Sequence, residues 1–276
     1  MQKTALNIEI ATRPKKVVVI LSPCRSGSTA LLNSFAMAGW QSLYQPVKAA
    51  LRRSVAGDNA PVVIRAETSC LVIKETLGPY NSAEVNYDPL GVLMEKGIDP
   101  KSIHVIALMR RPEECLDSWI RSFRKDDVDL SLFGASYNAV IDSCMAAQRR
   151  GAHIIPLRYE ELAFPETLPA LLTQLGLPYR EEMVKWTKSE KYQAGSFGFE
   201  YVSQPNHDQE SLDGGRGIGL MPKLPVSHIA ILPDEITTIA EISAAHDGYE
   251  YDLDIFAASK IGGLSSHRQH LRTASL

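Results

Sequence analysis

Residues 17–29 read VVVILSPCRSGST, an apolar run followed by a turn rich in serine. The first five residues are all β-branched or aliphatic, which is typical of a strand buried on both faces of a parallel sheet. Leu31, Leu32 and Phe35 then recur at helical spacing, and Gly39 provides a stop. This order of strand, turn and helix places the turn at the carboxyl end of a buried strand.

The turn has the composition of an anion site. Where a tight turn enters a helix, several backbone N–H groups point to one spot, and the helix dipole adds partial positive charge there. Gly27 allows the backbone to approach a ligand closely. Ser28 and Thr29 offer hydroxyls, and Arg25 offers a fixed cation. We therefore expect a phosphate-binding turn, and the alternative is a serine-rich helix cap without a ligand.

The turn lacks two features of an ATP or GTP site, which normally reads GxxxxGK[ST]. Ser22 stands where the first glycine would be, and Ser28 stands where the lysine would be. A later apolar run, residues 103–109, ends in Arg110 rather than in an aspartate that would help to hold Mg²⁺. Both differences weigh against a metal-dependent kinase or nucleotide hydrolase.

Other apolar runs and helical patterns alternate along the chain. Short apolar runs occur at residues 62–64, 71–73, 103–109 and 154–157. A helical stripe follows Pro112, and a leucine stripe within residues 168–175 ends at Gly176. Strands that alternate with helices predict an α/β fold with three layers, α/β/α, around a mainly parallel central sheet.

Length and composition fit one soluble globular domain. The chain has 276 residues, of which 45% are hydrophobic and 22% charged. We expect a single domain over residues 1–276, with loosely ordered tails at 1–14 and 259–276. No stretch approaches the roughly 18 apolar residues of a membrane span, and the N-terminus does not read as a signal peptide. The four cysteines form no CxxC pair, which argues against a disulfide framework or zinc site and favours a cytoplasmic location.

Charge is distributed unevenly. The formal net charge of −3 suggests no nucleic-acid partner. Residues 1–65 carry nine Lys and Arg against two Asp and Glu, whereas the remainder carries twenty against thirty. A basic N-terminal part suits a local anion site, and an uneven but solvated surface is the alternative.

Residues 110–118 read RRPEECLDS and form a second candidate anion site. Arg110 follows the end of a predicted strand, Pro112 suits the first position of a helix, and Ser118 lies about two turns along it. A guanidinium and a hydroxyl can then converge on one phosphate, since arginine makes fork-like contacts. The alternative is that Arg110 pairs with Glu113 or Asp117.

These segments resemble the sulfotransferase family that uses 3′-phosphoadenosine 5′-phosphosulfate (PAPS), in a soluble bacterial-type form. The phosphate turn of that family reads roughly [K/R]-S-G-[S/T]-T after the first strand, and residues 25–29 match it. Its second hallmark is an arginine, then x-Pro, then a serine eight residues after the arginine, as in residues 110–118. Residues 157–162 (LRYEEL) give a third, weaker match that is mainly architectural.

The resemblance implies a P-loop nucleotide-hydrolase-like fold. It also implies transfer of a sulfuryl group from PAPS to a hydroxyl or amine of a small-molecule acceptor, with 3′,5′-bisphosphoadenosine (PAP) leaving. A sulfuryl group carries less charge than a γ-phosphoryl group, so we expect no metal. We assign the stabilisation of the charge that develops on the leaving oxygen to Arg25 and the backbone amides of the turn. The donor-binding residues implied by the resemblance are Arg25, Ser26, Gly27, Ser28, Thr29, Arg110 and Ser118.

The general base is a point of difference from the family. Many soluble members carry a histidine in a K-T-H-like segment, whereas residues 74–76 here read KET, with Thr76 in its place. Glu75 is the first candidate base, because it follows a buried strand and partial burial would raise its pKa. The alternative is that Glu75 forms an ion pair with Lys74 or Arg65.

Three further residues or segments have expected roles. Lys74 can contact the transferring sulfuryl group, as the family's lysine at this place does. His207 is the second candidate base. Residues 197–225, rich in Gly, Pro, Asn and Asp, form a long loop that suits a lid, in which Arg216 can cover the 3′-phosphate and adenine.

Two other functions remain open. A small-molecule kinase would require Mg²⁺ and ATP. A non-catalytic nucleotide-binding relative is supported by the missing histidine alone. Neither the identity of the acceptor nor an oligomeric state follows from the sequence.

Overall fold

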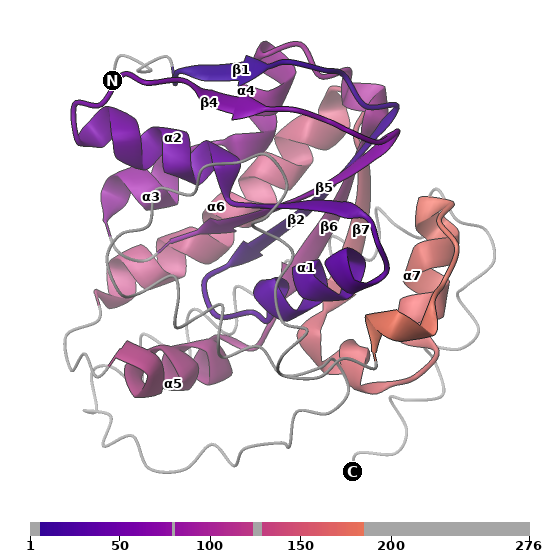
Figure 1. Cartoon of the computed structure of the whole chain (residues 1–276). Helices are drawn as coiled ribbons and strands as arrows, with labels where there is room; N and C mark the ends of the chain where they lie inside the picture. Colours follow the sequence, from indigo (N-terminus) through magenta and orange to yellow (C-terminus); the bar gives the residue numbers. More distant parts are fainter. Residues whose placement is uncertain (1–5, 79–80, 124–128, 185–276) are drawn as a thin grey trace.

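The computed structural model describes residues 6–78, 81–123 and 129–184 (Figure 1). The predicted lid, residues 197–225 with His207 and Arg216, lies outside the described residues, and so does the tail 259–276. Within the described ranges, no helix is both long enough and apolar enough to cross a membrane.

A five-stranded parallel sheet forms the centre of the described structure, in the order β3-β5-β2-β6-β7. The first long apolar run lies in the middle, where Val19 pairs with Ile73 on one side and Val105 on the other. Its residues are buried on both faces, as the β-branched pattern predicts. The strands are β2 (Lys16–Pro23), β3 (Gln41–Tyr44), β5 (Cys70–Leu77), β6 (Ile103–Met109) and β7 (His153–Arg158).

Helices cover both faces of this sheet (Figure 1). Val18 and Ile20 of β2 pack into a core with α1 (Ser28–Met37) and α7 (Thr167–Leu175). Val19 and Leu21 point to the opposite face and pack in a core with Cys115 and Leu116 of α5 (Pro112–Phe123) and with three further helices. These are α2 (Pro46–Val55), α4 (Pro89–Glu95) and α6 (Leu130–Arg149), and the short α3 (Ser82–Asn86) packs beside α6. The predicted three-layer α/β fold with a mainly parallel sheet is confirmed.

The connectivity places one end of β2 at a topological switch. From β2 the chain continues through β3 and β5 on one side of the sheet, and then crosses to β6 on the other side. In open parallel sheets, ligands bind at the carboxyl ends of the strands where the order reverses. The predicted phosphate turn lies at this place, and helix α5 (Pro112–Phe123) lies below the same strand ends in Figure 1.

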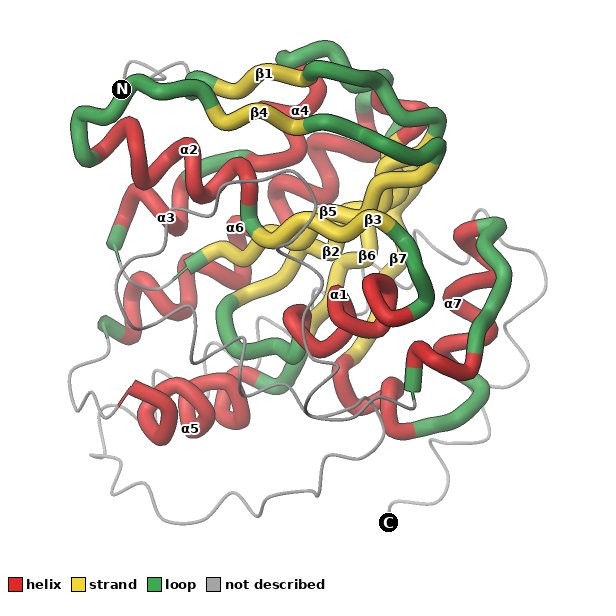
Figure 2. Tube along the Cα trace, viewed as in Figure 1, coloured by secondary structure: helices red, strands yellow, loops and turns green. Residues whose placement is uncertain are grey.

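A second, two-stranded sheet lies apart from the central one (Figure 2). In it, β1 (Ile8–Ile10) pairs in parallel with β4 (Val62–Ile64). The expectation of a loosely ordered tail over residues 1–14 is therefore wrong for this stretch. Burial alternates along this stretch: Leu6 and Ile8 are buried in the core, whereas Asn7 and Glu9 are exposed, as in a half-buried strand.

Three short 3₁₀ helices complete the described structure. They are η1 (Pro100–Ser102), η2 (Tyr159–Ala163) and η3 (Glu181–Met183). Of these, η2 directly follows β7 and therefore starts at the same edge of the sheet as the phosphate turn.

Candidate active site

The turn after β2 has an unusual backbone. Arg25 and Gly27 both have positive φ angles, 68° and 82°. Glycine adopts this left-handed conformation without strain, whereas arginine does so at a cost. A Cβ atom on Gly27 would also run into the ring of Tyr159, so only glycine fits there. Gly27 is the N-cap of α1 and provides no side-chain acceptor, which leaves the first N–H groups of the helix available to an anion.

Two buried serines, Ser22 and Ser26, lie at the turn. Ser26 donates a hydrogen bond to the Pro23 carbonyl at 3.0 Å, and its Oγ lies 3.6 Å from the Cys115 Sγ of α5. Ser22 is fully buried at the end of β2, and its Oγ has no hydrogen-bond partner among the described residues. Buried hydroxyls rarely lack a partner. The orphaned Ser22 hydroxyl therefore fits a polar ligand atom beside the turn.

The two predicted anion segments lie directly against each other. Arg25 Nε donates to Ser118 Oγ of α5 at 3.2 Å. Arg110 Nη1 in turn donates to the Arg25 carbonyl, also at 3.2 Å. These contacts join positions 93 and 85 residues apart in the sequence. The structure thus brings Arg25, Arg110 and Ser118 together into one site.

Arg110 has a carboxylate partner, although not one of those considered from the sequence. Its Nε donates to Glu114 Oε2 at 3.0 Å, one helical turn along α5. The other oxygen of Glu114 lies 2.7 Å from Arg111 Nη2. Arg111 also lies 3.7 Å from Glu160 Oε1, through its Nε, so the two arginines are surrounded by two carboxylates.

Tyr159 is a site residue that the sequence reasoning missed. It belongs to the segment 157–162, which was assigned a mainly architectural role. In the structure its ring lies against Gly27, and the Arg110 guanidinium stacks over it with Cζ 4.4 Å from the ring centroid. An aromatic residue at a strand end of the sheet was the available signal, since arginine stacks readily on aromatic faces.

Ser28 and Thr29 are the first residues of α1, and the structure places both at the turn. Ser28 is buried and Thr29 is half-buried. Together with Ser26 and Gly27, these two residues surround the N-terminus of α1. This is the place where residues that bind PAPS are expected. Arg216, expected to cover the same site, and His207 lie outside the described residues.

Glu75 is completely buried on the α2 side of the sheet. Its Oε1 accepts from Val47 N at 2.7 Å, and its Oε2 accepts from Lys48 N at 3.2 Å and from Tyr87 OH at 2.9 Å. Burial raises the pKa of Glu75 to about 7, against the lowering effect of these hydrogen bonds and of the Lys48 charge. A carboxylate with this pKa suits proton transfer near neutral pH, but it has no exposed surface with which to touch an acceptor.

Lys74 and Thr76 point to the opposite face from Glu75, because neighbouring residues of a strand alternate. Lys74 is buried, with Nζ 4.0 Å from the centroid of the Tyr44 ring. Thr76 hydrogen-bonds through its hydroxyl to the Gln45 side chain. Neither of the ion pairs considered for Glu75, with Lys74 or with Arg65, occurs among the described contacts.

Lys48 of α2 is a second residue that the sequence reasoning missed. It is buried and lies 3.3 Å from Glu84 Oε2. Burial raises the pKa of the Cys24 thiol in the turn, and the charge of Lys48 opposes this more than those of Arg25 and Lys74 do. The charge of Lys48 therefore acts on the turn, although nothing in its local sequence distinguishes it from a surface lysine.

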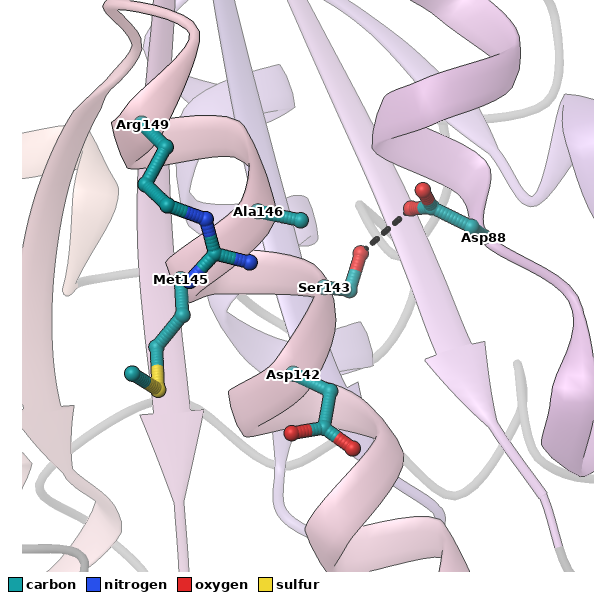
Figure 3. Close-up of a pocket in the computed structure, with 6 residues that line it drawn as sticks. All are labelled: Asp88, Asp142, Ser143, Met145, Ala146 and Arg149. Atoms are coloured by element: carbon teal, nitrogen blue, oxygen red, sulfur yellow. Dashed lines mark hydrogen bonds between the residues drawn. The ribbon is translucent and has the colours of Figure 1, made fainter.

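A groove lies elsewhere on the molecule, between the start of α4 and α6 (Figure 3). Its volume is about 390 Å³. One wall is fixed by Ser143 Oγ, which donates to Asp88 Oδ1 at 2.6 Å. The groove is lined by Asp88, Asp142, Ser143, Met145, Ala146 and Arg149, and it includes none of the predicted site residues.

The described residues contain no group of three His, Cys, Asp or Glu side chains that could hold a metal ion. The candidate site is built instead from arginines, lysines, hydroxyls and backbone amides, which are donors to anions rather than ligands of cations.

No family model and no curated protein sequence matches the chain. Among solved structures, the sulfotransferase domain from the curacin biosynthetic pathway has a TM-score of 0.42 and 16% identity, covering 68% of this chain and 82% of that one. The sulfotransferase domain from the Synechococcus PCC 7002 olefin synthase has a TM-score of 0.46 and 16% identity, covering 84% and 96%. Similarity at this level assigns the chain to no family.

Proposed function

We propose that the chain is a sulfotransferase that moves a sulfuryl group from PAPS to a hydroxyl or amine of a small-molecule acceptor. The proposal rests on one observation above all, the hydrogen bond of Arg25 Nε to Ser118 Oγ at 3.2 Å. It joins two segments that each have the composition of an anion site. A donor with phosphate groups at both ends of its nucleoside requires two such sites side by side.

Each segment has a separate role in this proposal. The N-terminus of α1, with Ser28 and Thr29, binds the 5′-phosphosulfate end. Arg25 stabilises the charge that develops on the leaving oxygen. Arg110 and Ser118 bind the 3′-phosphate, and Arg110 is oriented for this by its stacking on Tyr159. Lys74 is the proposed contact of the sulfuryl group itself.

The acceptor proton needs a base, and for this step we revise the order of the sequence candidates. Glu75 has a pKa raised to about 7, but three donors occupy its two oxygens and its side chain is buried. We assign it a positioning role, in which it holds the first turn of α2. His207, outside the described residues, remains the sequence candidate for the base.

The test is a thermal-shift titration with PAP and, in parallel, with ATP, each with and without Mg²⁺. A ligand that binds only the native state stabilises it by ~2.7 kcal/mol at a hundredfold excess over its Kd. We expect PAP to raise the melting temperature without metal. Transfer to an acceptor is then screened with PAPS and a panel of alcohols, phenols and amines.

Two results would count against the proposal. Stabilisation by Mg-ATP but not by PAP would favour a kinase. Stabilisation by PAP without transfer to any acceptor, and without slow hydrolysis of PAPS, would favour a non-catalytic nucleotide-binding protein.

A further inference from the structure

Glu75 and Tyr87 form a buried pair in which one hydrogen has two possible acceptors. The Tyr87 hydroxyl oxygen lies 2.9 Å from Glu75 Oε2 and 3.1 Å from the Thr76 carbonyl oxygen. A phenol has a single O–H hydrogen, so it can donate to only one of them well. Whether the hydrogen goes to Glu75 or to the Thr76 carbonyl depends on whether the carboxyl group of Glu75 carries a proton.

The two protonation states of Glu75 differ in how the Tyr87 hydrogen is used. When the carboxyl is ionised, it accepts from Val47 N, Lys48 N and Tyr87 OH. When it is neutral, Oε2–H can donate to the Tyr87 oxygen, and Tyr87 then donates to the Thr76 carbonyl. The neutral state therefore satisfies every group of this set, whereas the ionised state takes the Tyr87 hydrogen away from the buried Thr76 carbonyl, which favours the proton on Glu75.

Glu75 belongs to a buried charge cluster beside the phosphate turn. The charged groups that act on Glu75 and Tyr87 in the described structure are Lys48 and Arg52 of α2 and Glu84 of α3. Glu84 contacts both cations, Lys48 Nζ at 3.3 Å and Arg52 Nε at 2.8 Å. With Glu75 ionised, the two cations and two carboxylates balance. With Glu75 neutral, one positive charge is in excess.

Lys48 connects this cluster to the turn. Its charge acts on Glu75, and it is also the charge with the largest effect on the Cys24 thiol within the turn. Glu75 is also the register partner of Leu21 in β2, and Cys24 N of the turn donates to the Leu77 carbonyl at 3.1 Å, so a change of charge on Glu75 acts close to where an anion would bind. Burial keeps this interaction stronger than it would be in water.

We propose that Glu75 and Tyr87 form a proton-operated switch that tunes the anion affinity of the turn, with the neutral carboxyl as the tight-binding state. The switch itself requires no particular reaction. Its coupling to the turn rests on the anion site of the proposed function. Burial, which raises the pKa of Glu75 to about 7, places the change near neutral pH.

Linkage gives the direction of the effect. An anion at the turn disfavours a second negative charge nearby, so it raises the pH at which Glu75 loses its proton. Reciprocally, the anion binds more tightly below that pH than above it. We expect a change in affinity of about 2-fold or more, equivalent to a shift of about 0.3 pH units in the Glu75 titration.

The experiment follows the side-chain carboxyl carbon of Glu75 by NMR on ¹³C-labelled full-length protein, with and without sodium sulfate. Sulfate stays a dianion throughout, so its own titration does not interfere, and sodium chloride at equal ionic strength is the control. Glu75→Gln assigns the resonance by removing it. The matched variant Glu9→Gln, at an exposed position of β1, should leave it unchanged.

The expected result is a titration midpoint near 7 that rises when sulfate binds. The proposal is overturned if Glu75 stays ionised well below pH 6, or if sulfate shifts the amide resonances of the turn without moving the midpoint. If sulfate does not bind at all, the coupling and the anion site of the proposed function both fail. The midpoint without sulfate then still reports separately on the switch.

Two variants separate a switch from a merely structural contact. In Glu75→Gln the side chain is neutral at every pH: its amide nitrogen can donate to Tyr87 and its carbonyl accepts from Val47 N, while Lys48 N loses its acceptor. Sulfate affinity in this variant should be the same on both sides of pH 7 and close to the low-pH value of the wild type. Tyr87→Phe keeps the packing and removes the shared hydrogen, so the Glu75 midpoint should move upward. An unchanged midpoint would exclude Tyr87 from the switch.

Discussion

At the scale of single residues, the phosphate turn depends on backbone geometry as much as on side chains. Gly27 has a φ of 82° and packs against the Tyr159 ring, so its position excludes a side chain for two reasons. Arg25 also has a positive φ, at 68°, which costs energy in a residue with a Cβ atom. Strain of this kind persists only where its surroundings hold it, and it often marks functional sites.

Gly27→Ala should destabilise the protein by more than backbone strain alone. A left-handed alanine costs roughly 1–2 kcal/mol, and the new methyl group must also displace the Tyr159 ring. Gly57→Ala is the matched control, since Gly57 has a φ of 76° and nothing within 4 Å of an added Cβ. Chemical denaturation of both variants measures the difference. Equal losses would mean that the contact with Tyr159 is unimportant.

Arg25→Ala and Ser118→Ala should each weaken PAP binding. Loss of a hydrogen bond to a charged group costs ~1.5–3 kcal/mol, or roughly 10- to 150-fold in affinity. Isothermal titration calorimetry gives the affinities directly. Arg149→Ala and Ser82→Ala, at exposed helix positions, should bind PAP as the wild type does. Wild-type affinity in both site variants would refute the assignment of the phosphate-binding residues.

At the scale of secondary-structure elements, β2 supports both halves of the molecule. Its side chains alternate between the core below α1 and the core below α2, α4 and α6. The strand also ends in the phosphate turn. Loss of packing along β2 should therefore reduce the stability of the whole described fold rather than of one layer.

Leu21→Ala tests this role of β2. Leu21 is fully buried next to the turn, so its truncation leaves a cavity and should cost ~2–5 kcal/mol of unfolding free energy. Val55→Ala at the exposed end of α2 should change stability by less than about 0.5 kcal/mol. Urea denaturation followed by circular dichroism compares them. A small loss for Leu21→Ala would show that the site relaxes and that β2 is less central than its burial indicates.

At the scale of the whole molecule, two titrating groups give stability opposite dependences on pH. Burial raises the pKa of Glu75 to about 7, so the folded state holds this proton more tightly than the unfolded chain does. Its stabilisation is fully present below pH 4.5 and is lost as pH rises through about 7. Burial, Lys16 and His153 lower the pKa of His104 to about 4, so stability falls as pH drops from 6.5 towards 4.

Removing one group at a time should separate these contributions. Glu75→Gln should abolish the loss of stability between pH 4.5 and about 7. The pH dependence that His104 contributes is then measured alone. His104→Gln should instead reduce the loss on acidification below pH 6.5. Unfolding free energies measured across this range give both slopes. Identical pH profiles for the wild type and Glu75→Gln would show that Glu75 ionises normally.

Much of the central fold could be predicted because its signals are local. The β-branched run of β2, the helical spacing in α1 and the proline that begins α5 each act within a few residues. The missed elements had weaker local signals. Ile8–Ile10 is only three residues long, and β3 (Gln41–Tyr44) includes two polar residues that tertiary contacts bury. Burial of such residues depends on partners distant in sequence.

The order of strand, turn and helix, the α/β class and the two candidate anion segments could be predicted without a structure, because hydrophobic periodicity and turn composition are encoded locally. The contact of Arg25 with Ser118, the packing of Tyr159 on the turn and the burial of Glu75 beneath α2 became known from the folded structure alone. Because side chains alternate along β5, Lys74 and Glu75 must face opposite sides of the sheet. Alternation does not specify which of the two side chains is shut off from a ligand. That was decided by packing between segments far apart in the chain, which no local pattern specifies.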